Sequence, residues 1–395
     1  MAEYCADTNI FEAENFPCVE EANSAMTKGI TETAIYLTSC AVNGTKPEEG
    51  RLSGVDFGEL FSFASYHMMS AVVAMGLEAA GIMDTNVKRH IAYSVRKNTY
   101  LETASREVQN KFEEAGIWYM PLKGSVLKEY YPRFGMREMS DQDILIDETR
   151  AWDVKRIMGS LSFTTEYYGQ GSHDVYYREP LCNFEIHREL FGSTFDEKIH
   201  EYYADVKSRL MKDTGNKYGY HFSPEDFYVY ITAHEYKHYS GSGTGLRSLL
   251  DVYVYLKKFG EILDCDYVKS EVAKLGISEF EEQNRSLAEN LFGGYELTEE
   301  NREMLEYVVQ SGAYGTVENS IKNKLATYGR DWKGKIKYLA TRVFPNSQDM
   351  KNTYPLLCGH KILYPALVCY RLLRALVKRR RETLREICIL WQIKS

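Results

Sequence analysis

The feature that most restricts the fold of this chain is a block at residues 105–200 in which strand-like and helix-like patterns alternate. Its strand-like runs are short, and turn-forming residues such as Gly169–Ser172 and Glu179–Pro180 separate them. On both sides of the block, apolar residues recur at the three- and four-residue spacing of α-helices. Strands that are confined to one block between helical flanks predict an α+β fold with one small sheet.

The same patterns predict where the individual elements lie. Strands are expected at residues 117–122, 142–146, 163–168, 174–178 and 182–187. Helices are expected at residues 56–81, 87–115, 124–131, 150–161, 224–240 and 246–260. The helix that begins at Pro224 has the clearest start, because Ser223 is a capping residue, proline fits the first helical position and two acids follow.

Charge and pattern divide the 395 residues into five expected parts. These are an acidic N-terminal segment (1–50), an N-terminal helical region (51–104), the α/β core (105–200), a helical accessory domain (201–345) and a basic C-terminal helical segment (346–395). Residues 1–22 contain six acids and no base, whereas residues 371–395 contain eight basic residues and two acids. The net charge of −8 therefore combines an acidic body with a basic tail, and it argues against a general nucleic-acid coat.

The basic tail has the pattern of an amphipathic helix. Its basic run Lys378–Arg381 alternates with six apolar residues, which are Leu372, Leu373, Leu376, Ile387, Leu390 and Trp391. Such a helix usually packs on the protein body with its basic face in water. Contact with RNA, with an anionic membrane surface or with an acidic partner is the alternative.

Several absences favour a cytoplasmic protein. The first residues lack the basic and apolar regions of a secretory signal, and no run of about 18 apolar residues predicts a membrane-spanning helix. The eight cysteines are scattered without a C-x-x-C pair, which is typical of reduced thiols and indicates neither a disulfide framework nor a cysteine zinc site.

Three acids in the α/β core have the arrangement of a metal site. Asp141 and Asp143 are two residues apart at a predicted strand, so their side chains project from the same face. Glu185 lies on another predicted strand of the same block. Two adjacent carboxylates are costly unless a cation lies between them, and three carboxylates that converge suit Mg²⁺.

A second feature of the core is suited to binding phosphate. Gly124 and Ser125 follow a predicted strand and open a predicted helix, where free backbone N–H groups bind anions, and Lys123 adds a positive charge. Phosphate binding beside a carboxylate–metal site is typical of phosphoryl and nucleotidyl transfer.

Together these motifs resemble the nucleotidyltransferase superfamily of DNA polymerase beta, and more narrowly a bacterial, uncharacterised nucleotidyltransferase family within it. The resemblance rests on Leu122-Lys123-Gly124, on Arg137 followed by Asp141 and Asp143, and on Glu185-Ile186-His187. It covers roughly residues 50–260. It implies a small mixed sheet with flanking helices, and Mg²⁺- or Mn²⁺-dependent transfer of a nucleoside monophosphate from an NTP to a hydroxyl acceptor, with release of pyrophosphate.

The resemblance also implies a role for each residue. Asp141, Asp143 and Glu185 would bind the metal ion, and Glu185 would help to draw a proton from the acceptor. Nucleotide phosphates would contact Lys123, Gly124, Ser125 and Arg137, while His187 would orient the acids. A protein that keeps this fold only to bind nucleotides, or as a scaffold, is an alternative.

A competing motif lies downstream. His234-Glu235-Tyr236-Lys237-His238 matches H-E-x-x-H, which places two imidazoles on one helix face and binds zinc in metallohydrolases. Asp251 or Glu261 would then supply a third ligand. The resemblance assigns this stretch to accessory helices instead, where His234, His238 and Arg247 face the cleft as substrate contacts or have structural roles. Arg247 and Asp251, four residues apart, are expected to pair with each other.

Overall fold

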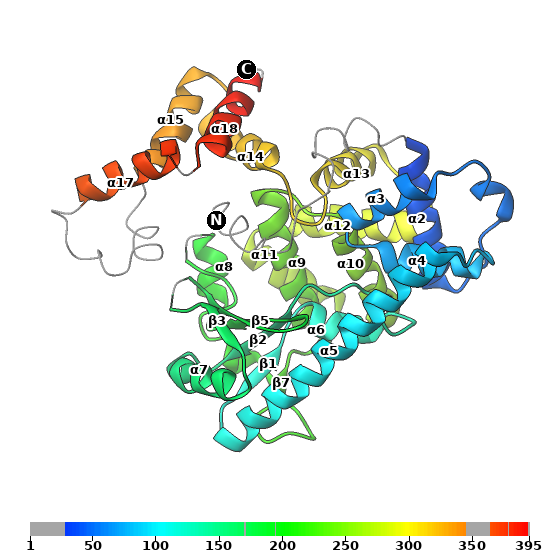
Figure 1. Cartoon of the computed structure of the whole chain (residues 1–395), viewed down its shortest axis with the longest axis horizontal. Coiled ribbons are helices and arrows are strands. Elements are labelled where there is room, and N and C mark those ends of the chain that lie inside the picture. The colour runs from blue at the N-terminus through cyan, green and yellow to red at the C-terminus, as the bar shows by residue number, and fades with distance from the viewer. Residues whose placement is uncertain (1–27, 170, 194, 345–363, 378, 394–395) are drawn as a thin grey trace. The chain divides into compact units, whose positions relative to one another are not determined.

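The computed structural model describes residues 28–169, 171–193, 195–344, 364–377 and 379–393 of the chain (Figure 1). Two compact units can be distinguished in it. One contains residues 28–236 and 245–313, and the other contains residues 237–244 together with the described residues from 314 onward.

The first unit is built around a mixed five-stranded sheet, so the predicted α+β class is confirmed. Its strands are β1 (Tyr119–Pro121), β2 (Gln142–Ile146), β3 (Thr164–Tyr167), β4 (His173–Arg178) and β5 (Cys182–His187). Their spatial order is β1-β2-β5-β4-β3. Strands β2 and β5 are parallel, and every other neighbouring pair is antiparallel.

The two faces of this sheet have different characters, because side chains alternate between them. One face carries Ile144, Ile146, Phe184 and Ile186, all buried in the main hydrophobic core. Helix α5 (Thr85–Ala115), the long cyan helix of Figure 1, and α7 (Ala151–Ser160) cover this face and contribute their own apolar residues. Asp143, Glu185 and His187, which alternate with these apolar residues, are therefore directed to the other face.

The N-terminal helices differ from the prediction in one respect. The expected helix at residues 56–81 is wrong, because the chain forms two helices, α3 (Phe57–Tyr66) and α4 (Ser70–Ala79). Between them Met68 has a φ of 54°, a left-handed conformation that no continuous helix contains. His67, at this break, is fully buried and accepts a hydrogen bond from the backbone N–H of Leu246. The break thus ties this region to the helices that follow the sheet.

The remaining elements of the first unit are mostly helical. They are α2 (Lys28–Asn43), α6 (Gly124–Leu127), α8 (Glu197–Tyr202), α9 (Pro224–Gly241, whose last residues belong to the second unit), α10 (Leu246–Phe259), α11 (Cys265–Leu275), α12 (Ser278–Gly293) and α13 (Glu299–Ser311). Short 3₁₀ turns lie at Glu49–Leu52, Lys128–Tyr130, Glu148–Arg150 and Val206–Arg209, and β6 (Met211–Lys212) pairs with β7 (Tyr220–His221). The predicted starts of α9 and α10 are confirmed.

The second unit contains α14 (Val317–Tyr328), α15 (Trp332–Val343), α17 (Tyr364–Val377) and α18 (Arg380–Gln392). A small core of Ile321, Leu325, Tyr338 and Leu390 joins α14, α15 and α18. The basic tail therefore forms two helices instead of one. Of its predicted apolar face, Leu390 is buried, whereas Leu372, Leu373 and Trp391 are exposed. Lys378 and the side chain of Leu376 lie outside what the structure describes.

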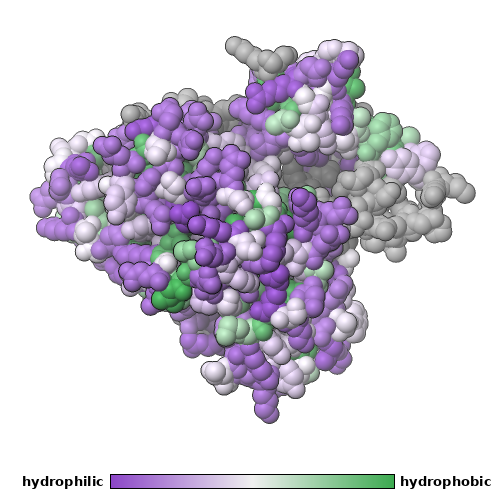
Figure 2. Space-filling model, turned by 180° about the vertical axis from the view of Figure 1, so that it is seen from behind, coloured by the Kyte–Doolittle hydropathy of each residue, from purple (hydrophilic) through white to green (hydrophobic). Residues whose placement is uncertain are grey.

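Hydrophilic residues cover most of the face shown in Figure 2, and apolar residues on it form small separate groups. Over the described part of the chain, no helix combines the length and the apolar character that crossing a bilayer requires.

Candidate active site

The parallel register of β2 and β5 brings two of the three predicted acids together. Asp143 lies directly opposite Glu185, and both belong to the face of the sheet that faces away from the main core. Asp141 precedes β2 by one residue and accepts a hydrogen bond from the Ser140 hydroxyl at 3.1 Å. Burial, together with the charges of Asp143 and Glu185, raises the pKa of Asp141 to about 7. The three carboxylates therefore lie within electrostatic reach of one another.

Asp143 is the best-anchored of the three acids. It is 4% exposed, and its Oδ1 lies 2.6 Å from Lys123 Nζ and 2.8 Å from His187 Nε2. Burial alone would raise the pKa of Asp143, but the Lys123 ammonium and the hydrogen bond with His187 hold it well below its usual range. The same competition, with His187 nearby, lowers the pKa of Glu185. Two of the acids are thus held ionised.

The predicted phosphate-binding turn lies beside these acids. The backbone N–H of Leu122 donates to the carbonyl of Asp143 at 2.9 Å, which fixes the end of β1 against β2. Lys123 then has a φ of 46°, an uncommon left-handed conformation that turns the chain into α6. Its ammonium is directed to Asp143 in this structure.

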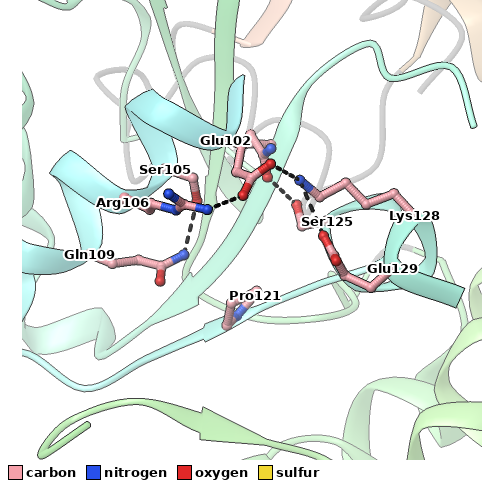
Figure 3. A pocket seen from close by; sticks show the side chains of 9 residues that line it. Glu102, Ser105, Arg106, Gln109, Pro121, Ser125, Lys128 and Glu129 are labelled. Carbon is pink, nitrogen blue, oxygen red and sulfur yellow. Dashed lines mark hydrogen bonds and ion pairs between the residues drawn. The ribbon is translucent and has the colours of Figure 1, made fainter. Parts of the chain in front are cut away.

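Ser125, the hydroxyl of this turn, lies toward α5. Its Oγ donates to Gln142 Oε1, and both residues line a cavity of about 190 Å³ between the turn and α5 (Figure 3). Charged groups surround this cavity, and Figure 3 shows Lys128 between Glu102 and Glu129. None of the three predicted metal-binding acids lines it.

Arg137 takes part in a buried network that the sequence did not reveal. Its Nε and Nη2 donate to the two carboxylate oxygens of Asp251 on α10, each at 2.7 Å, and Tyr131 donates to the same carboxylate at 2.7 Å. The guanidinium also packs against Gly124 so closely that a methyl group there would overlap it. The expected pairing of Asp251 with Arg247 is therefore replaced by a pairing with Arg137.

Arg247 itself lies within electrostatic reach of the acids. Its positive charge opposes the rise in the pKa of Asp141, and its Nη1 lies 2.9 Å from Met68 Sδ. Lys97 on α5 is a further cation near Asp141, and burial lowers its pKa. Sequence patterns offered no sign of Lys97, because a lone lysine on an amphipathic helix is most often exposed.

The residues of the H-E-x-x-H motif do not assemble a metal site. Among the described residues, the His, Cys, Asp and Glu groups of three that come close enough to hold a metal ion include neither His234 nor His238. The ring of His234 lies 6.2 Å from that of Tyr230, and His238 belongs to the second unit. Glu235 is 6% exposed and accepts a hydrogen bond from Asn284 at 2.9 Å. Glu235 thus packs against α12 through Asn284 and does not face a metal ion together with the two histidines.

Glu235 provides a testable pH dependence. Burial and the charge of Asp251 raise its pKa to about 8 from 4.5, so the folded state binds a proton that the unfolded state releases above pH 4.5. Stability from this group is present in full below pH 4.5 and is lost as the pH rises toward 8. Glutamine has nearly the same shape as glutamate and carries no charge. At pH 9 the variant Glu235→Gln therefore avoids the cost of a buried negative charge, and its free energy of unfolding should exceed that of the wild type by about 2–4 kcal/mol.

Urea unfolding at pH 5 and at pH 9 measures this difference. The gain of Glu235→Gln should be small at pH 5 and large at pH 9. Glu289→Gln, which alters a glutamate of α12 that is 47% exposed, is the matched control and should show no such trend. Equal pH profiles for Glu235→Gln and the wild type would contradict a buried, protonated Glu235.

His173 completes the polar face and was missed by the sequence analysis. It pairs with His187 across the β4–β5 hairpin, and its ring centroid lies 5.1 Å from that of His187. Burial lowers the pKa of His173 to about 4, so the ring is neutral near pH 7. The sequence contained the information needed to find His173. The tight turn at Glu179–Leu181 fixes the strand register, and counting back from this turn places residue 173 opposite residue 187.

Comparison with known proteins identifies the family of this chain. A family model described as "Uncharacterised nucleotidyltransferase" matches residues 53–293. No curated protein and no solved structure matches the chain. The matched region includes the turn, the three acids and α9 to α12. Because the match covers more than half of its residues, the chain belongs to this family of uncharacterised nucleotidyltransferases.

Proposed function

We propose that this protein transfers a nucleoside monophosphate from an NTP to a hydroxyl-bearing acceptor and releases pyrophosphate, with Mg²⁺ or Mn²⁺ at Asp141, Asp143 and Glu185. The observation that carries this proposal is the β2–β5 register, which sets Asp143 opposite Glu185 on the face of the sheet directed away from the core. Family membership supports the reaction type.

The donor set at this site fits a hard divalent cation. It consists of carboxylate oxygens, which Mg²⁺ and Mn²⁺ prefer. Burial and the charges of Asp143 and Glu185 raise the pKa of Asp141, and the opposing charges of Lys123 and Arg247 do not cancel this rise. A bound divalent ion would supply charge neutralisation for the phosphoryl group in transfer. The residues present therefore fit the ion.

We assign triphosphate binding to Lys123 and to the turn that follows it. Lys123 Nζ is 2.6 Å from Asp143, so a phosphate that reaches the acids also reaches this ammonium. Gly124 leaves the backbone of the turn open to close approach. Arg137 is better suited to positioning the turn than to contacting phosphate, because its Nε and Nη2 are engaged by Asp251.

We assign proton removal from the acceptor hydroxyl to Glu185. Its pKa is lowered, so the carboxylate is ionised near pH 7 and can accept a hydrogen bond from the acceptor hydroxyl as that group loses its proton. The side chain is 25% exposed, in contrast to the nearly buried Asp143, and it is therefore reachable by a substrate. His187, hydrogen-bonded to Asp143, orients this part of the site.

The test is metal-dependent NTP binding and pyrophosphate release by the full chain. Wild-type protein should bind NTP in the presence of Mg²⁺ or Mn²⁺, and the double variant Asp141→Asn with Asp143→Asn should lose this binding. Asp153→Asn, on the partly exposed surface of α7, is the control and should behave as the wild type. Unchanged metal-dependent binding in the double variant would refute the assignment. Binding without pyrophosphate release from any NTP would instead favour a silent nucleotide-binding protein.

A further inference from the structure

A second group of metal-binding side chains lies on the same face of the sheet. The ligand atoms of His173, Glu185 and His187 all lie within 4.8 Å of one another. Strand geometry explains this, because His173 and His187 face each other across the β4–β5 pair and Glu185 is two residues from His187 on the same face. The group includes two imidazoles that the proposed Mg²⁺ site does not use as ligands.

The carboxylate of Glu185 lies near both imidazoles without a hydrogen bond to either. Glu185 Oε2 lies 3.7 Å from His187 Nε2 and 3.8 Å from His173 Nε2, beyond hydrogen-bonding distance. Around a metal ion with bonds of about 2.1 Å, neighbouring ligand atoms are about 3.0–3.4 Å apart. The two distances from Glu185 exceed this spacing by less than about 1 Å, so small side-chain rotations would let the carboxylate share an ion with the rings.

The surroundings of the two imidazoles support the same conclusion. His187 is 5% exposed, yet its Nδ1 has no hydrogen-bond partner among the residues that the structure describes. The protein thus leaves one nitrogen of a buried ring unsatisfied, which is costly for a purely structural histidine. On the other ring, Nδ1 of His173 lies 3.4 Å from the Ser172 hydroxyl, so its Nε2 is left for a ligand.

From this geometry we infer that His173, Glu185 and His187 form a site for a divalent transition-metal ion. Two imidazole nitrogens and one carboxylate oxygen suit Zn²⁺, Fe²⁺ or Mn²⁺, whereas Mg²⁺ favours oxygen ligands and bound water. His187 Nε2 is hydrogen-bonded to Asp143 Oδ1 at 2.8 Å, so the unpartnered Nδ1 of this ring is the nitrogen left for the ion. The inference extends the proposed function, because Glu185 would belong to both sites, and it predicts that the histidine-containing site prefers transition-metal ions to Mg²⁺.

Binding of Mn²⁺ alone, without nucleotide, tests the site on the full chain. Mn²⁺ is the suitable probe because it takes nitrogen and oxygen ligands, and the exposed thiols of Cys265, Cys369 and Cys388 favour softer ions. Electron paramagnetic resonance of free Mn²⁺ gives the affinity, and its pulsed form detects nitrogen coupled to the bound ion. Wild-type protein should bind Mn²⁺ with nitrogen coupling and should retain it in excess Mg²⁺.

His173→Gln is the decisive variant, because this side chain is 35% exposed and its replacement by a polar residue of similar size is compatible with the fold. Its Mn²⁺ affinity should fall at least about tenfold, and the nitrogen coupling should weaken. His187→Asn should have the same effect. The matched control is His221→Gln, which removes a histidine that pairs with Asp213 far from this group in sequence, and it should bind Mn²⁺ as the wild type does.

Unchanged affinity in His173→Gln, or bound Mn²⁺ without nitrogen coupling in the wild type, would overturn the inference. Asp141→Asn separates the two proposals, because Asp141 is outside the histidine group. It should lose pyrophosphate release and keep nitrogen-coupled Mn²⁺. If wild-type protein binds Mn²⁺ through nitrogen but never releases pyrophosphate, the proposed function fails and the metal site stands. If pyrophosphate release requires Asp141 but not His173, and bound Mn²⁺ shows no nitrogen coupling, the proposed function stands and the metal site at the histidines fails.

Discussion

Replacing Asp141 by asparagine is expected to abolish nucleotidyl transfer and, at the same time, to stabilise the metal-free protein at pH 8. The loss of activity follows from the loss of one metal ligand. Metal stabilisation of the transferring phosphoryl group is worth several kcal/mol, so the rate of pyrophosphate release should fall by about 10³-fold.

The gain in stability has an electrostatic cause. Burial, Asp143 and Glu185 raise the pKa of Asp141 from 3.8 to about 7, so folding binds a proton at intermediate pH and stability from this group is lost as the pH rises from 3.8 to 7. At pH 8 the wild type bears the full cost of a third negative charge. Asparagine removes that charge, and the free energy of unfolding should rise by about 1–3 kcal/mol.

Both effects can be measured on the same preparations. Thermal unfolding in the presence of a chelator gives the stability at pH 8, and pyrophosphate release gives the rate. The control Asp153→Asn should change neither, since Asp153 pairs with Arg150 at the partly exposed start of α7. A variant that loses activity together with stability would mean that Asp141 supports the fold, which would argue against its role as a metal ligand.

The largest loss of stability is expected from Asp251→Leu. Asp251 is 8% exposed and accepts hydrogen bonds from Arg137 Nε and Nη2 and from the Tyr131 hydroxyl. Leucine would leave the Arg137 guanidinium buried without a counter-charge. Breaking a buried ion pair in this way costs about 3–5 kcal/mol, whereas replacing both partners by apolar residues is often nearly neutral. The double variant Arg137→Met with Asp251→Leu should therefore recover much of the loss.

Urea unfolding of the single and double variants measures these differences. The surface pair of Arg133 and Glu78 provides the matched control, because Arg133 is 48% exposed. Glu78→Gln should cost less than about 1 kcal/mol, as exposed ion pairs do. A cost for Asp251→Leu as small as that for Glu78→Gln would show that Arg137 finds another partner. A double variant less stable than Asp251→Leu would show that the guanidinium itself packs favourably against Gly124.

Much of the local structure was predictable because local rules determine it. The strands at 142–146 and 182–187 have the predicted bounds, since each is a short run in which every second residue is apolar or buried, and a turn lies at one of its ends. Ser223 and Pro224 marked the start of α9 for the same kind of local reason. The break at Met68 was not predictable from the apolar pattern, which continues at helical spacing through it.

The site was predictable where its residues follow from strand alternation and not where they depend on tertiary packing. Alternation placed Asp141 and Asp143 on one face, and a motif supplied Glu185. The partner of Arg137 required knowledge of how α10 lies against the turn, since Asp251 is 114 residues away in the sequence. Local spacing pointed to Arg247 instead. His173 could have been predicted only in part. The hairpin register places it opposite His187, but it belongs to no recognised sequence motif.

The register of β5 between its two neighbours also limits how this region can change in length during evolution. Deletion of a single residue from the segment Cys182–Phe184 would shift the strand by one position and turn Glu185 and His187 toward the apolar side covered by α5 and α7. The site would disappear although every one of its residues remained in the gene. Tolerated insertions and deletions in relatives should therefore be confined to the connections, such as the glycine-containing turn between β3 and β4.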